Sequence, residues 1–171
     1  MDFERFKQIN EQKNFQGELN DPSVISITKN SGCGDAYRIY LKIDESDPQK
    51  KVTDASYTTT GCAFSVAALS LAMEWAKGKP LSTIKSIKAS DIEAMFEFPE
   101  RRKTYPEAAA RALQKAVIDY ENHTGISIKD IASRDLALQK LKEQGHLRNE
   151  KLARVNFEGV DLHGVDLSGA D

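Results

Sequence analysis

The hydrophobic pattern of this chain changes its period at Gly61, and this change limits the fold more than any other feature. Three segments before it predict β-strands, because they alternate in polarity or are rich in β-branched residues: 23–29, 36–44 and 52–60. After it, apolar residues recur at helical spacing from Phe64 to Trp75, and Gly78 with Pro80 ends the helix. We therefore predict an α+β fold, a three-stranded antiparallel sheet with helices packed on one face.

Further helices are predicted on both sides of this region. Ser90 and Glu93 fit the S-x-x-E capping box, which predicts a short helix that ends near Phe96. Pro106 suits the first position of a longer helix, and Gly125 lies beyond its end. Weaker helical patterns occupy two other segments, residues 3–9 and 127–144.

The C-terminal tail repeats a short pattern every five residues, in VNFEG, VDLHG and VDLSG, starting at Val155. This pattern resembles the pentapeptide-repeat family, whose square coils bury one apolar and one small residue of each unit. A single short coil and an irregular tail are both compatible with so few units. The predicted domains are a scaffold-like domain at 1–125, a helical extension at 126–150 and a pentapeptide-repeat-like tail at 151–171.

The charge balance and hydropathy exclude several classes of partner. The 24 basic and 26 acidic residues give a net charge of −2, too balanced for binding to a phosphate backbone, so we expect no nucleic acid. No apolar stretch is long enough to span a bilayer, and the first residues lack the pattern of a signal peptide, so we expect no membrane partner and a cytoplasmic protein. In that reducing compartment the two cysteines are free thiols or metal ligands.

Two interpretations of these cysteines are open. A free cysteine is often a small buried residue without chemical duty. However, Cys33 stands between glycines, Asp35 follows it with a carboxylate, and Cys62 lies where helix N-terminal amides favour a thiolate. The second interpretation is therefore a metal site of Cys33, Asp35 and Cys62 at one end of the sheet.

Three stretches carry a resemblance to a known family: SGCGD, TTTGCAFSVAALSLAMEWAKGKPL, and SIKASDI with the later FP and AAARALQKAVIDY. In this order and spacing, over about residues 5–120, they resemble the IscU/NifU N-terminal scaffold family of iron–sulfur cluster assembly. The resemblance implies a scaffold on which a cluster is built from iron and from sulfur delivered by a cysteine desulfurase, and then passed to acceptor apoproteins. The family's first cysteine and its aspartate fall on Cys33 and Asp35, and its second cysteine falls on Cys62.

The chain departs from the family at its third cysteine. By this resemblance Thr104 stands in place of a histidine and Tyr105 in place of the cysteine. A tyrosine phenolate can bind ferric iron, although its ordinary pKa near 10 makes a packing role more common. Tyr105 is therefore a candidate for the fourth ligand position and also a candidate core residue.

These residues lead to a scaffold-like protein that binds iron or an iron–sulfur cluster and is not an enzyme, since no catalytic triad or phosphate-binding loop is present. Each chain offers two thiols where clusters usually take four, so either a homodimer pools Cys33 and Cys62 from both chains, or Asp35 and exogenous thiols complete the ligands. Two alternatives remain. One is a protein-binding or regulatory module without a cluster, and the other is a mononuclear zinc site of Cys33, Asp35, Cys62 and water.

Overall fold

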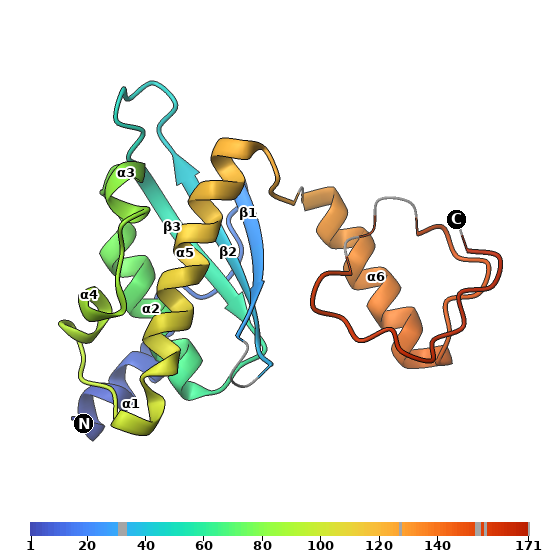
Figure 1. Ribbon diagram of the computed structural model, residues 1–171, viewed down its shortest axis with the longest axis horizontal. Coiled ribbons are helices and arrows are strands. Elements are labelled where there is room, and N and C mark those ends of the chain that lie inside the picture. The colour runs from blue at the N-terminus through green and yellow to red at the C-terminus, as the bar shows by residue number, and fades with distance from the viewer. Residues whose placement is uncertain (31–33, 127, 153–154, 156, 171) are drawn as a thin grey trace. The chain divides into compact units, whose positions relative to one another are not determined.

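The computed structural model describes residues 1–30, 34–126, 128–152, 155 and 157–170 of the 171-residue chain. Figure 1 shows the elements along them, in the order α1 (Phe3–Gln12), β1 (Val24–Lys29), β2 (Ala36–Ile43), β3 (Val52–Thr59), α2 (Ala63–Ala76), α3 (Leu81–Ile84), α4 (Ala89–Glu93), η1 (Glu100–Arg102), α5 (Thr104–Asn122) and α6 (Ile128–Gln144). The chain divides into two compact units, residues 1–125 and residues 126–171.

The first unit contains a three-stranded sheet in the order β1-β2-β3, and both strand pairs are antiparallel. Ile39 in the central strand pairs with Ser26 on one side and Tyr57 on the other. The register shifts once, between Lys42 and Ile43, near the hairpin that joins β2 to β3. The predicted α+β fold is confirmed, and each strand lies within about one residue of its expected bounds because the alternating pattern sets them.

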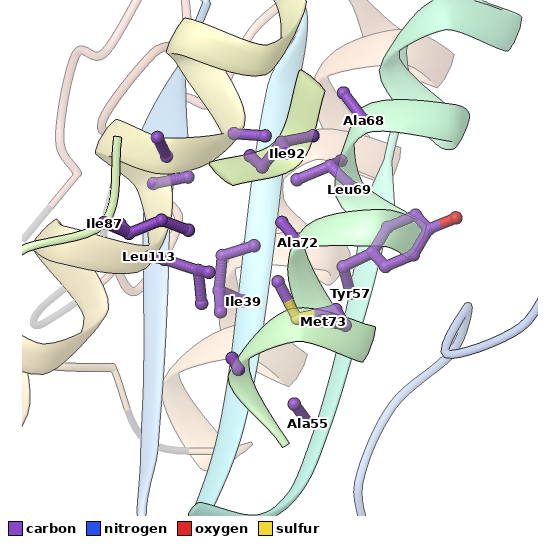
Figure 2. Packing of buried hydrophobic residues seen from close by; sticks show 14 of the residues in the cluster. Ile39, Ala55, Tyr57, Ala68, Leu69, Ala72, Met73, Ile87, Ile92 and Leu113 are labelled. Carbon is purple, nitrogen blue, oxygen red and sulfur yellow. The ribbon is translucent and has the colours of Figure 1, made fainter. Parts of the chain in front are cut away.

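Helices α2 and α5 lie side by side across one face of this sheet (Figure 1), and α1 packs against α2. Figure 2 shows Ile39 of the sheet close to Leu113 of α5, with Leu69 and Met73 of α2 facing the sheet and Tyr57 beside Met73. All five side chains are fully buried, and burying one of this size contributes about 2 kcal/mol. Both helices also bury several alanines, which lets their backbones approach closely: Ala67, Ala68 and Ala72 in α2, and Ala109, Ala112 and Ala116 in α5.

A buried carboxylate ties α5 to the edge strand β1. Asp119 is 8% exposed and accepts a hydrogen bond of 2.5 Å from the Ser26 hydroxyl and one of 2.8 Å from the Thr124 hydroxyl. Lys115 forms an ion pair with it at 3.2 Å and also donates to the carbonyl oxygen of Ile27 at 2.7 Å. The charge is thus satisfied from both elements, as a buried carboxylate requires.

Two helix starts differ from the prediction. The capping box of Ser90 and Glu93 is wrong, because α4 begins earlier and the Asp91 carboxylate accepts from the backbone N–H of Lys88 at 2.8 Å. Pro106 is the third residue of α5, which begins at Thr104, and not the first. Proline fits there because backbone N–H groups in the first turn of a helix have no intrahelical partner.

The second unit contains α6, which confirms the helix predicted at 127–144, and a series of turns. In each turn a glycine has a positive φ and a backbone N–H bonds to the carbonyl oxygen three residues earlier. The pattern recurs every five residues, at 157–160, 162–165 and 167–170, with Gly159, Gly164 and Gly169 at φ of 78°, 75° and 70°. The described part of the tail is therefore regular, while its kinship with pentapeptide-repeat proteins stays a prediction.

Among the described residues, no helix has both the length and the apolar character that crossing a bilayer demands.

Candidate metal centre

The strand ends place two of the predicted ligands at one end of the sheet. Asp35 immediately precedes β2, and Cys62 follows β3 by a short turn and is the N-cap residue of α2. Because β2 and β3 are antiparallel neighbours, the start of one lies beside the end of the other, and Tyr37 pairs with Thr59. Asp35 and Cys62 therefore approach the same region from adjacent strands.

Ser65 in the first turn of α2 connects this region to the core. Its hydroxyl donates to Oδ2 of Asp35 at 2.9 Å and lies 3.2 Å from the hydroxyl oxygen of Tyr37. The side-chain amide of Asn30 donates to the same Tyr37 oxygen at 3.0 Å. Ser65 and Tyr37 are fully buried and Asn30 is 4% exposed, so these polar groups are held within the protein.

Gly61 makes this arrangement sterically feasible. A Cβ atom at this position would lie 2.6 Å from Oδ2 of Asp35 and would also collide with the Ser65 hydroxyl. Real Cβ atoms essentially never approach other atoms so closely. The glycine before Cys62 is therefore needed for the close approach of the Asp35 and Ser65 side chains, and not for an unusual backbone angle.

The Cys62 side chain is exposed, and its sulfur lies in hydrogen-bond contact with Tyr105. Partial burial raises the pKa of the thiol, but the Tyr105 hydroxyl, the backbone N–H groups of Ser65 and Phe64, and the Ser65 hydroxyl lower it more, so the pKa lies below its ordinary value. Cys62 makes no side-chain cap hydrogen bond, so these N–H groups act on the sulfur as nearby dipoles. The result is an accessible sulfur biased toward the thiolate that metals bind.

Tyr105 has the packing role considered for it in the sequence, while its role as a fourth ligand stays a prediction. Its side chain is 6% exposed, and its ring packs on Phe64 with the ring centroids 5.7 Å apart. Arg102 covers the same Phe64 ring, with its guanidinium carbon 5.0 Å from the centroid. The aromatic ring is thus core packing, while the hydroxyl reaches the candidate metal centre.

The structure brings together Asp35, Cys62 and Tyr105, whereas Cys33 lies outside the described residues. Within the described ranges, no group of three histidine, cysteine or acidic side chains is close enough to hold a metal ion. The donor set is chemically suited to iron or zinc, since both accept thiolate and carboxylate ligands. Ser65 and Tyr37 were not singled out from the sequence. A serine three residues after a cysteine at a helix start is only a weak indication of a role at the site. No sequence pattern shows that the hydroxyls of Ser65 and Tyr37 lie in contact.

A cleft of about 790 Å³ in the first unit has no part in this centre. Its walls come from the β2–β3 hairpin, α3 and the end of α5, and none of the predicted ligands lines it. Its charged side chains pair with one another, Lys85 with Glu121 at 2.7 Å and Lys50 with Glu45 at 3.4 Å.

Comparison with known proteins identifies relatives of the first unit. The family model of NifU-like N-terminal domains matches residues 6–127. The iron–sulfur cluster assembly scaffold protein IscU 1 of Archaeoglobus fulgidus is 30% identical over 129 residues, which cover 75% of this chain and 80% of that protein. The iron–sulfur cluster assembly protein 1 of rice, Oryza sativa subsp. japonica, is 34% identical over 105 residues. That match covers 61% of this chain and 60% of the rice protein.

Solved structures share the fold at lower identity. A NifU-like protein (N-terminal) from Brucella abortus has a TM-score of 0.51 and 18% identity, with 69% of this chain and 92% of that one covered. A structure from Fervidobacterium islandicum AW-1, described as an iron–sulfur cluster assembly scaffold for the SUF system, has a TM-score of 0.50 and 20% identity. It covers 66% of this chain and 93% of that one, and at such identities both likenesses concern the fold alone.

Proposed function

Since this chain belongs to the family of NifU-like N-terminal domains, we propose that it is a scaffold that holds iron or an iron–sulfur cluster through Cys33, Asp35 and Cys62. Relatives at 30% identity or more carry the name of iron–sulfur cluster assembly proteins, and one of them extends over three quarters of the chain. The cluster is cargo for such a protein, which binds and releases it and does not turn over a small substrate.

One observation supports this proposal above the others. The Asp35 carboxylate and the Cys62 thiol both meet the first turn of α2, where Ser65 bonds the carboxylate and the helix amides favour a thiolate. A hard oxygen and a soft sulfur beside each other at the edge of a rigid core suit a metal that is bound and later released.

The number of thiols in one chain determines how many cluster ligands must come from another molecule. Two cysteines per chain leave a cluster short of its usual four thiolates. A homodimer that pools Cys33 and Cys62 from both chains would supply four, and exogenous thiols are the other source. The Tyr105 hydroxyl reaches Cys62 and is the candidate for the fourth position in a single chain. We propose a cysteine desulfurase as the source of sulfur and acceptor apoproteins as the recipients.

Anaerobic reconstitution tests this proposal. The full chain is incubated with ferrous iron, cysteine, a catalytic amount of cysteine desulfurase and dithiothreitol, which reduces the desulfurase persulfide to sulfide, and then desalted. We expect sulfur-to-iron charge-transfer bands in the visible spectrum, with stoichiometric iron and sulfide, and a loss of both in Cys33→Ser and Cys62→Ser. Ser70→Ala is the matched control, because this buried serine of α2 bonds Tyr57 and none of the predicted ligands, and should reconstitute like wild type.

Other outcomes would overturn the proposal and point to a different function. Metal analysis of protein purified without chelators that finds one zinc per chain, lost in the cysteine variants, would assign a mononuclear zinc site of Cys33, Asp35, Cys62 and water. No bands and no metal in any sample, together with desulfurase binding that survives replacement of both cysteines, would assign a protein-binding module.

A further inference from the structure

Three buried groups form a chain of hydrogen bonds that ends on the Asp35 carboxylate. The chain runs from the Asn30 amide to the Tyr37 hydroxyl, from there to the Ser65 hydroxyl, and from Ser65 to Oδ2 of Asp35, with distances of 3.0, 3.2 and 2.9 Å. It crosses from the sheet to α2 and back to the turn before β2, so it links separate elements of the fold.

The direction of each bond follows from the chemistry of the groups. The Ser65 hydroxyl donates to the Asp35 carboxylate and has a single proton to give. Ser65 must then accept from Tyr37, whose own oxygen accepts from the Asn30 amide, which donates. All three bonds therefore point toward the carboxylate, and such aligned bonds polarise and strengthen one another.

We propose that Ser65, supported by Tyr37 and Asn30, is the positioning residue that fixes the orientation of Asp35 at the metal centre. A carboxylate is planar, so holding Oδ2 against Ser65 also sets the direction of Oδ1. Ser65 stands three residues after Cys62 on the same rigid helix, which sets the position of the carboxylate relative to the thiol. The part of this inference that treats Asp35 as a metal ligand rests on the proposed function, and the part that concerns the orientation of the carboxylate does not.

The depth of these side chains makes the arrangement rigid. Ser65 and Tyr37 are fully buried, and a side chain at position 61 would collide with both the Ser65 hydroxyl and the Asp35 carboxylate. Hydrogen-bond partners that orient a metal ligand typically contribute a factor of about 10 to 100 in metal affinity. Loss of the Ser65 hydroxyl should therefore change metal binding without removing any ligand.

The first test measures Co²⁺ binding to the full-length protein by anaerobic titration, with the visible d–d bands as the report on ligand geometry. We expect Ser65→Ala to bind Co²⁺ about tenfold more weakly, with altered d–d bands, and Tyr37→Phe to bind about threefold more weakly. In the double variant, Tyr37→Phe should add no further loss, because the bond through which it acts is already absent. Wild-type affinity and spectrum in Ser65→Ala would overturn the proposal.

The matched control is the other buried Ser–Tyr pair of α2. Ser70 is 4% exposed and its hydroxyl lies 2.7 Å from that of Tyr57, with no contact to Asp35. Ser70→Ala should lower the midpoint of thermal unfolding as much as Ser65→Ala does, and leave Co²⁺ affinity unchanged. An equal loss of Co²⁺ affinity in both variants would reduce Ser65 to a structural role.

A second readout needs no metal. Three-bond couplings of isotope-labelled protein report the χ1 rotamer of Asp35, which we expect to be single in wild type and averaged in Ser65→Ala. A single rotamer in both would overturn the proposal, whatever the metal does. If wild-type protein binds neither Co²⁺ nor a cluster, the scaffold function fails, while the couplings still decide the role of Ser65.

Discussion

The sulfur of Cys62 lies 3.4 Å from the hydroxyl oxygen of Tyr105, which packs its ring into the core. By the family resemblance, a cysteine would stand at this position. The contact therefore replaces a potential third thiolate with a hydrogen-bond donor to the second one. By the resemblance the centre has one thiol fewer, and the exposed Cys62 thiol is more acidic than an ordinary cysteine.

Replacing Tyr105 with phenylalanine should make Cys62 less reactive. The ring and its contact with Phe64 remain, but the hydroxyl that lowers the pKa of the thiol is lost. We expect alkylation of Cys62 by iodoacetamide at neutral pH to slow about two- to fivefold, which is the effect of one ordinary hydrogen bond. Peptide mapping by mass spectrometry measures Cys62 separately from Cys33.

The pH dependence gives the sign of this effect. The thiolate is the form that reacts, and it forms as the pH rises through the pKa of the thiol. Because the pKa of Cys62 is lowered, its alkylation rate should rise at a lower pH than that of an ordinary cysteine. Tyr105→Phe should move that rise to higher pH, and the two rates should converge where both thiols are fully ionised. Tyr57→Phe removes a buried hydroxyl of β3 that bonds Val66 and Ser70 of α2 and not Cys62, and it should leave the profile unchanged. An identical profile for Tyr105→Phe and wild type would contradict the assigned role.

Gly61→Ala should disturb the centre and destabilise the protein by about 2 kcal/mol, because the new methyl group would overlap with Asp35 and Ser65. Urea unfolding measures the stability, and the Asp35 couplings measure the disturbance. Gly78→Ala is the comparison, since its cost of about 1 kcal/mol comes from a φ of +86° with open space around it. Equal effects of the two changes on Asp35 would refute the steric argument.

Asp119→Ala should cost about 3 kcal/mol of unfolding free energy, because it removes the ion pair with Lys115 and the acceptor that the Ser26 and Thr124 hydroxyls share between α5 and β1. Urea denaturation checks this. Glu107→Ala provides a control on the same helix, since its ion pair with Arg111 is exposed and contributes less than about 1 kcal/mol. Comparable losses would mean that the buried network contributes no more than a surface pair.

A protein truncated after Ser127 should fold by itself. Residues 1–125 form a compact unit with its own core, and the family match ends at 127. Gly125 closes this unit, because a Cβ there would lie 2.8 Å from Cγ2 of Val24. We expect a single cooperative urea transition and unchanged reactivity of Cys62. A truncated protein without a cooperative transition would show that the first unit depends on the second.

The sequence predicted the elements that are long enough to show a repeating hydrophobic pattern. The strands and α2 follow from alternation before Gly61 and helical spacing after it, which are set by which side chains must be buried. Two short elements were missed. A four-residue helix at Leu81–Ile84 and a three-residue 3-10 turn at Glu100–Arg102 are too brief to show a period. At Lys88 the capping carboxylate came from Asp91, because this acidic residue lies closer to the actual start than Glu93 does.

The centre was predictable in part. The position of Cys62 at a helix start follows from the change of period, and the structure places Asp35 at the same end of the sheet. The contact of Ser65 with Asp35 and Tyr37 was not predictable, since it depends on how the helix is rotated above the sheet. Tertiary packing sets the rotation of α2, and the sequence pattern of the helix alone does not predict it.

The recurring glycine turns of the tail have a consequence for how its length can vary. Each turn closes its own backbone bond and takes its positive φ from its own glycine, but the last repeat is also held by the segment that follows α6, because the backbone N–H groups of Leu147 and Asn149 donate to the carbonyl oxygens of Asp166 and Ser168 at 3.0 Å each. Deletion of one five-residue module would remove or displace the acceptors of these two bonds. A change of length in the tail should therefore alter the second compact unit, which contains both partners of each bond.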